Sequence, residues 1–207
     1  MKAMKLTAAI FDIGNVLLPF DYMRAADTLI ARNRPAQPPS RERVAAAKEE
    51  LELGRIDRSE FLRRVLPEFA HEGPVEDFLN AWRDIFSANP PIDELVAELA
   101  PHIPLYLLSN ISCIHREHVH ATYPVFRHFR DGIYSYEVGL MKPDPAIFQV
   151  AIERLGVDPS STLYIDDMPE NVESALAAGF LAVRYDHTRH GEAEARIRAL
   201  MDGKSQA

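Results

Sequence analysis

The sequence predicts an α/β fold in which a parallel sheet is interrupted by an insertion made only of helices. In the second half of the chain, short apolar segments alternate with helical patterns, as a parallel sheet with crossover helices requires. The first apolar segment is followed instead by helical patterns without a convincing strand. We therefore expect an α/β core formed by residues 1–20 and 90–207, and a small all-helical cap formed by residues 21–89.

The expected strands are short, mostly apolar runs separated by helical patterns. They are residues 8–11, 104–108, 132–135, 161–165 and 180–184. Asp144 and Gly156 bound one of the connecting helices, and Pro169 and Gly179 bound another, as expected from the residues that favour helix starts and ends. This alternation favours a parallel arrangement of the strands.

The cap is predicted from helical patterns alone. Residues 41–53 form a charged helical pattern that ends at Gly54, a residue suited to the left-handed position after a helix. We expect Trp82 to pack in the interior of the cap and not to stack on a sugar. Substrate specificity should reside in the cap, but its patterns say nothing about the shape of a pocket.

Composition and charge narrow the classes of partner. The chain carries 31 acidic and 23 basic residues, and its net charge of -8 argues against a broad surface for nucleic acid or anionic membrane. A small anionic substrate is still compatible, because a bound metal can invert the local field. No segment approaches the ~20 apolar residues of a membrane span, and the single cysteine, Cys113, suits a reducing compartment. We expect a cytoplasmic protein, and the sequence leaves its oligomeric state open.

Polar residues stand at the ends of three expected strands, and a lysine precedes a turn that contains proline. They are Asp12, Ser109–Asn110, Asp166–Asp167 and Lys142. Taken singly, most have an ordinary explanation, since Asp and Ser commonly cap turns and helices and lysine is commonly solvated. Asp166 and Asp167 are different, because adjacent carboxylates repel unless a cation compensates. Ligands collect at the carboxyl edge of a parallel sheet, so Asp12 is a candidate nucleophile or metal ligand.

The order of these features resembles the haloacid dehalogenase superfamily across nearly the whole chain. Three segments, 11–16, 54–57 and 135–139, look like those of its small sugar-phosphate phosphatases, notably the α-D-glucose-1-phosphate phosphatase type. The resemblance implies a Rossmann-like core with a helical cap. It also implies a Mg²⁺-dependent phosphomonoesterase that acts on a small phosphorylated metabolite, such as a sugar phosphate.

The resemblance implies a role for each of the carboxylates. Asp12 would attack phosphorus and form an aspartyl-phosphate, which divides one difficult step into two. Asp12, Asp167 and the backbone carbonyl of Gly14 would hold Mg²⁺, which prefers oxygen ligands. Asp166 would hold a metal-bound water or serve as a secondary ligand.

The remaining roles concern the phosphoryl group. Ser109 would bind a phosphoryl oxygen, and Asn110 would help to shape that loop. Lys142 would neutralise both the phosphoryl group and the crowded carboxylates. Asn171 would support the loop that carries the metal ligands.

Gly14 departs from the pattern of the superfamily. Most of its phosphatases have a second Asp two residues after the nucleophile, which acts as general acid and then as base. General acid–base catalysis is worth about 10²–10⁴ in rate, so the loss of this Asp should slow the reaction. The loss does not abolish activity by resemblance, because the glucose-1-phosphate phosphatase type shares this glycine. We therefore expect a preference for leaving groups that need little protonation, such as anomeric or aryl phosphates.

Three alternatives remain open from the sequence. A haloacid dehalogenase would share the nucleophile but would not need Mg²⁺, so the pair Asp166–Asp167 counts against it. A phosphomutase would more naturally retain the acid/base residue that Gly14 replaces. A non-catalytic phosphate-binding or interaction protein is the third alternative, and the retention of Asp12, Ser109 and Lys142 argues against it.

Two weaker signals lie outside the main motifs. His115, His118 and His120 fall on a helical pattern, and we expect them to be solvated or at a helix end, not metal ligands. Glu52, just before Gly54, is a candidate to face the substrate from the cap.

Overall fold

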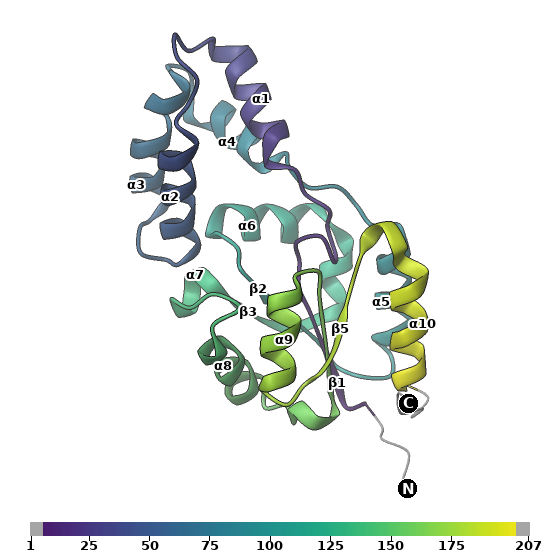
Figure 1. The fold of residues 1–207 in the computed structure, drawn as a ribbon. Coiled ribbons are helices and arrows are strands. Elements are labelled where there is room, and N and C mark those ends of the chain that lie inside the picture. The colour runs from purple at the N-terminus through teal and green to yellow at the C-terminus, as the bar shows by residue number, and fades with distance from the viewer. Residues whose placement is uncertain (1–5, 202–207) are drawn as a thin grey trace, which may run out of the picture.

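A computed structural model describes residues 6–201 as a parallel sheet covered by helices, with a separate block of helices to one side (Figure 1). Within these residues the sheet has five strands in the order β3-β2-β1-β4-β5. Every neighbouring pair is parallel. The strands are β1 (Ala8–Phe11), β2 (Leu105–Ser109), β3 (Phe129–Tyr134), β4 (Thr162–Asp166) and β5 (Leu181–Arg184). The predicted α/β fold is confirmed.

The three central strands, β1, β2 and β4, are buried on both faces of the sheet, which explains their mostly apolar character. In β1, Ala9 and Phe11 pack into the apolar cluster on one face, and Ile10 packs into the cluster on the other. Helices α5, α6 and α10 contribute to the first cluster, and α8 and α9 to the second. These helices are α5 (Pro90–Leu99), α6 (Cys113–Thr122), α8 (Pro145–Leu155), α9 (Pro169–Ala177) and α10 (His190–Met201).

Short helices complete the connections between strands. They are η2 (Pro124–His128), α7 (Ser135–Val138), η3 (Pro159–Ser161) and η4 (His187–Arg189). In the described part of the chain, none of the helices combines the length and apolar character needed to cross a membrane.

The residues predicted as the cap form a helical block around an aromatic interior. Trp82 is 4% exposed, and its ring lies 5.3 Å from that of Phe61 and 5.8 Å from that of Phe78 between centroids. The prediction that Trp82 packs in the interior is confirmed. The helices of the block are α1 (Tyr22–Asn33), α2 (Arg41–Glu52), α3 (Arg58–Val65), η1 (Pro67–Phe69) and α4 (Val75–Arg83).

The chain enters and leaves this block through two segments that lie side by side. Phe20 and Phe86 form an antiparallel bridge. The backbone N–H of Asp21 donates to the carbonyl of Ile85 at 2.9 Å. The division of the chain at residues 21–89 stays a prediction, and residues 1–5 and 202–207 of the predicted core lie outside the described residues.

The end of α2 approaches the core at Gly54. This glycine has φ +65°, and a Cβ placed on it would lie 2.2 Å from the backbone oxygen of Tyr136 in α7. Only a residue without a side chain allows this contact between the two backbones. Gly54 therefore fixes how the end of α2 sits against the α/β core.

We expect Gly54→Ala to destabilise the protein more than Gly156→Ala. Both glycines have a similar positive φ, but nothing lies within 4 Å of a Cβ at Gly156. The left-handed conformation costs about 1–2 kcal/mol in either variant, and the clash at Gly54 should add about 1–3 kcal/mol. Urea unfolding measures the two free energies, and equal losses would show that α7 relaxes freely away from Gly54.

Candidate active site

The predicted polar residues meet at the carboxyl edge of the sheet. Asp12 directly follows β1, Ser109 is the last residue of β2, and Asp166 is the last residue of β4. Lys142 reaches the same place from the loop between α7 and α8. Because neighbouring parallel strands run in one direction, their ends meet at one edge, and the order of this sheet reverses at β1, where ligand sites commonly form.

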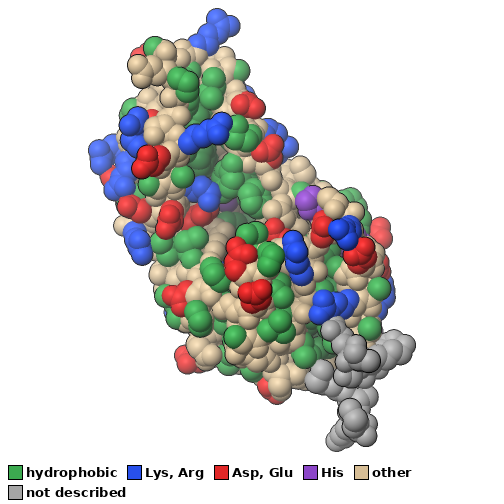
Figure 2. Space-filling view, viewed as in Figure 1, with side chains coloured by type: hydrophobic (Ala, Val, Ile, Leu, Met, Phe, Trp, Pro, Cys, Tyr) green, Lys and Arg blue, Asp and Glu red, His purple; other side chains and the backbone are tan. Residues whose placement is uncertain are grey.

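A pocket of about 250 Å³ lies at this edge, between the sheet and the cap. Figure 2 shows the surface hollowed between the helical block and the α/β part, with acidic and basic side chains interspersed around it. All the predicted site residues line the pocket except Asp166, which lies beneath it. The cap also contributes polar side chains to the wall: Tyr22, Lys48 and Glu52.

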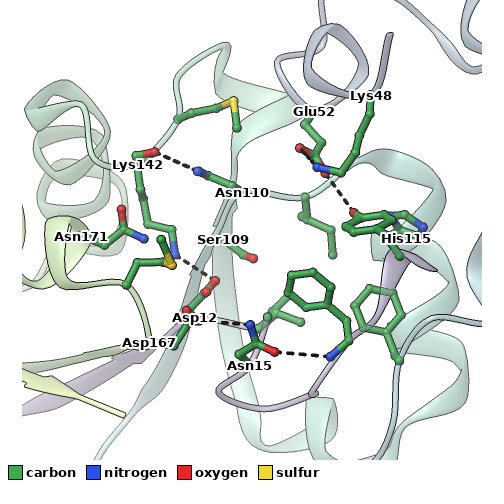
Figure 3. Close-up of a pocket in the computed structure, with 18 residues that line it drawn as sticks. Asp12, Asn15, Lys48, Glu52, Ser109, Asn110, His115, Lys142, Asp167 and Asn171 are labelled. Atoms are coloured by element: carbon green, nitrogen blue, oxygen red, sulfur yellow. Dashed lines mark hydrogen bonds and ion pairs between the residues drawn. The ribbon is translucent and has the colours of Figure 1, made fainter. Parts of the chain in front are cut away.

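Lys142 is the buried cation of the site. Its side chain is 1% exposed, and its Nζ lies 2.9 Å from Asp12 Oδ1 and 2.6 Å from Asp166 Oδ2. Asn110 fixes the backbone of this lysine, because its side-chain amide accepts from the Lys142 N–H and donates to the Lys142 carbonyl, both at 2.9 Å. The lysine is therefore held from both ends (Figure 3).

Asp166 is fully buried and uses both of its carboxylate oxygens. Oδ2 accepts from Lys142 Nζ and from the hydroxyl of Tyr164. Oδ1 accepts from the Met168 N–H and from Asn171 Nδ2, each at 2.9 Å. Burial acts to raise the pKa of Asp166, but the Lys142 charge and these hydrogen bonds outweigh it and lower the pKa. This carboxylate positions Lys142, and its predicted indirect role at the metal stays a prediction.

Asp12 lies in a different environment. Its carboxylate is buried, and burial raises its pKa to about 6, against the opposing effects of Lys142 and of a hydrogen bond from Ser109. Asp12 Oδ1 makes no well-directed hydrogen bond although Lys142 Nζ is near. An incompletely satisfied carboxylate at a pocket is suited to accept a further cationic or electrophilic partner.

The donor set fits a hard divalent cation. One oxygen from each of Asp12, Asp166 and Asp167 lies within 4.8 Å of the others. Lys142 supplies one positive charge against these three carboxylates, so the cluster retains negative charge when all are ionised. Asp167 faces the pocket, and its Oδ2 accepts from Asn15 Nδ2 at 3.1 Å, which orients it. Oxygen ligands of this kind suit Mg²⁺.

A side chain at residue 14 would meet the ring of Phe20. A Cβ at this position would lie 2.8 Å from Cε1 of Phe20, so the phenyl ring occupies the space that a side chain at residue 14 would enter. The next residue, Asn15, adopts φ 53°, which turns the chain sharply after the nucleophile candidate. The exposed ring of Phe20 therefore stands beside the position from which the acid of the superfamily would extend.

The comparisons with known proteins agree with this architecture. The family model of haloacid dehalogenase-like hydrolases matches residues 6–179. The chain belongs to this family. It is 26% identical to a D-ribitol-5-phosphate phosphatase of Bacteroides thetaiotaomicron, over 83% of this chain and 87% of that one. It is also 26% identical to a phosphatase of Mycobacterium tuberculosis, over 97% of this chain and 99% of that one.

The fold is shared with solved structures of the family. A haloacid dehalogenase family enzyme of Bacteroides thetaiotaomicron superposes with a TM-score of 0.80 at 23% identity, over 94% of this chain and 98% of that one. The same enzyme has been crystallised with magnesium and inorganic phosphate. This chain is thus a haloacid dehalogenase-like hydrolase, and the two relatives named above, which it matches over most of their length, are phosphatases.

His115 corrects one expectation about this hydrolase. It was expected to be solvated or at a helix end. It does lie in the first turn of α6, but it is not solvated: it is 1% exposed and lines the pocket. Its Nε2–H donates to the Trp82 carbonyl at 3.0 Å, which ties α6 of the core to the end of α4. His115 lies four residues before the buried Val119, so the two share one face of the helix. That spacing was the signal in the sequence for its burial.

Burial of His115 predicts a loss of stability in acid. Burial lowers the pKa of His115 from 6.5 to about 4. The unfolded chain therefore binds this proton first, and stability is lost as pH falls from about 6.5 toward 4. The loss between pH 7 and pH 5 should be about 2 kcal/mol. His115→Gln can still donate to Trp82 but does not titrate, so its free energy of unfolding should fall less over this range.

Urea unfolding at the two pH values measures this difference. His102→Gln, on the surface, is the control and should keep the full acid sensitivity of the wild type. Equal slopes for the wild type and His115→Gln would contradict the neutral, buried state of His115.

Proposed function

We propose that this hydrolase is a Mg²⁺-dependent phosphomonoesterase that acts on a small phosphorylated metabolite. The observation that carries the proposal is the convergence of Asp12, Ser109, Lys142 and Asp167 on one pocket at the carboxyl edge of the sheet. A carboxylate nucleophile, a hydroxyl, an ammonium and an additional oxygen ligand are the groups that phosphoryl transfer to Asp requires.

In the proposed reaction an oxygen of Asp12 attacks phosphorus in line with the leaving group. The new O–P bond forms as the bond to the alcohol oxygen breaks, and the electron pair of that bond leaves with the oxygen. Water then attacks the aspartyl-phosphate, releasing inorganic phosphate and restoring Asp12. Lys142 and the Ser109 hydroxyl hold phosphoryl oxygens, and Asn110 keeps Lys142 in place.

The proposed metal site uses Asp12, Asp167 and the backbone carbonyl of Gly14. Mg²⁺ bound there supplies positive charge against the phosphoryl oxygens. The acidic cluster supports this assignment, as do the magnesium and phosphate in crystals of the Bacteroides enzyme. Asp166 and Asn171 hold the adjacent loop through their hydrogen bond. We also propose a cytoplasmic location, because a single cysteine suits a reducing compartment.

The alternatives account for less of the site. Halide displacement needs no metal, so it would not explain why Asp167 faces the pocket and is oriented by a hydrogen bond from Asn15. A phosphomutase must protonate and deprotonate sugar hydroxyls, and Phe20 fills the space for the acid that would do so. A purely phosphate-binding protein would have no need for a buried carboxylate facing the incoming anion, since like charges repel.

The proposal predicts metal-dependent hydrolysis of p-nitrophenyl phosphate. EDTA should abolish the activity and Mg²⁺ should restore it. Asp12→Asn should lower kcat by on the order of 10³-fold or more, because the nucleophile is lost. Asp77→Asn, an exposed residue of α4, is the matched control and should retain wild-type rates. Hydrolysis that survives in Asp12→Asn would contradict the aspartyl-phosphate route.

We further propose that the substrate is a sugar phosphate with an activated leaving group, such as glucose 1-phosphate. The support is Gly14, which carries no acid, and the Phe20 ring that lies against it. An anomeric oxygen leaves as a weaker base than a simple alkoxide and needs less protonation.

This second proposal predicts that kcat/KM is higher for glucose 1-phosphate than for glucose 6-phosphate. The difference should be about tenfold or more, since general acid catalysis is worth about 10²–10⁴ where the leaving group needs it. A coupled assay for released phosphate measures both substrates under the same conditions. Equal turnover would contradict the role given to Gly14.

A further inference from the structure

The cap contributes a charged pair to the wall of the pocket that faces the catalytic edge. Glu52 ends α2, and Lys48 lies one turn before it on the same helix. Lys48 Nζ lies 2.8 Å from Glu52 Oε2, and the hydroxyl of Tyr22 donates to Glu52 Oε1 at 3.3 Å. Figure 3 shows Glu52 and Lys48 on the opposite side of the pocket from Asp12 and Lys142.

Burying this ion pair adds little to the stability of the fold, so its presence is better explained by a role in the pocket. Glu52 is 4% exposed, and burial raises the pKa of its carboxyl against the opposing charge of Lys48. Buried ion pairs commonly add little net stability compared with apolar side chains of similar size. A pair that only joined α1 to α2 would therefore be replaceable by apolar contacts.

The pair also retains free hydrogen-bonding capacity. Each carboxylate oxygen of Glu52 accepts from one group, and Lys48 donates to one oxygen. A carboxylate offers about four acceptor positions and an ammonium three donors. The wall can thus accept hydrogen bonds from hydroxyls and donate to them, with no net charge. A second anionic group on the substrate would meet the Glu52 carboxylate.

We infer that Glu52 and Lys48 determine specificity by hydrogen bonding to the hydroxyl groups of a sugar or polyol monophosphate. This inference rests on the proposed phosphatase function, which supplies the phosphoryl end of the pocket. Gly54 holds the end of α2 against the core and so fixes the span from Asp12 to Glu52. The rings of Phe20 and Phe86, which also line the pocket, provide apolar surface between the two ends.

The rival explanation is that the cluster only joins α1 to α2. A test must therefore separate recognition of the leaving group from general support of the cap. p-Nitrophenyl phosphate serves this purpose, because its leaving group carries no sugar hydroxyls. A loss of cap structure would reduce hydrolysis of both kinds of substrate together.

The experiment compares kcat/KM for p-nitrophenyl phosphate with that for the hexose, pentose or pentitol monophosphate that the wild type hydrolyses fastest. For Glu52→Gln and for Lys48→Met, the ratio of polyhydroxy substrate to aryl phosphate should fall about 10- to 100-fold, since hydrogen bonds to charged groups are lost. The change should lie mainly in KM. Glu49→Gln, exposed on the same helix, is the matched control and should keep the wild-type ratio.

The outcomes distinguish a failure of this inference from a failure of the proposed phosphatase function. An unchanged ratio in both variants, or equal losses on both substrates, would overturn the inference. It is also overturned if the wild type hydrolyses p-nitrophenyl phosphate but none of the polyhydroxy monophosphates. No Mg²⁺-dependent hydrolysis of any of these phosphates would instead refute the proposed function. Lys48 is partly exposed, so its variant still decides the question if Glu52→Gln does not fold.

Discussion

The candidate site depends on the Lys142 ammonium that lies between the carboxylates of Asp12 and Asp166. Without this cation, three acidic groups crowded at one edge of a buried sheet could not remain ionised together. The lysine is held there because Asn110 fixes its backbone and Asp166 fixes its side chain. Asp166 in turn receives the Met168 N–H at the start of α9. Lys142, in the loop after α7, thus joins the loops that follow β1 and β4 through its charge and the loop that follows β2 through its backbone.

The loop that carries Asp12 also leads into the cap. Asp12 is followed by the turn at Gly14, and the chain then passes Phe20 before it enters α1. Phe20 contacts the space above Gly14 and pairs with Phe86, where the chain returns from the cap. The ring that lies against Gly14 is therefore part of the connection between core and cap. A change in the placement of the cap would alter the environment of the leaving group through this one residue.

Most of the core could be predicted from the sequence because its signals are local. The strands β1, β2 and β4 are short, mostly apolar runs, and the polar residue at the end of each is the neighbour of that run in the chain. The strand β3 begins at Phe129, before the predicted 132, because its exposed Arg130 and Asp131 hide the apolar signal. Residues such as Asp12 and Ser109 then meet because parallel strands share an edge. In the wall that the cap contributes, Glu52 was a candidate from its place before Gly54 and does line the pocket, but Lys48 had no such signal. Lys48 reads as one charge on a charged helix, and only the docking of α2 against α7 brings it to the pocket. His115 was misjudged for the same reason, since its burial depends on Trp82 in the cap.

The two ends of the pocket place complementary demands on a substrate. In the proposed function, the core end binds the phosphoryl group, and Gly14, with the Phe20 ring beside it, supplies no acid to the departing oxygen. The substrate itself must then supply a leaving group that departs easily. The cap end offers a neutral but strongly polar pair, Lys48 and Glu52, which suits hydroxyl groups. A sugar with its phosphate on the anomeric oxygen, which is the substrate we propose, would meet both demands, since that oxygen is the better leaving group and the ring carries hydroxyls that the cap pair can bind. In this proposal Gly14 and Glu52 act on one specificity, Gly14 at the leaving oxygen and Glu52 at the hydroxyls of the sugar.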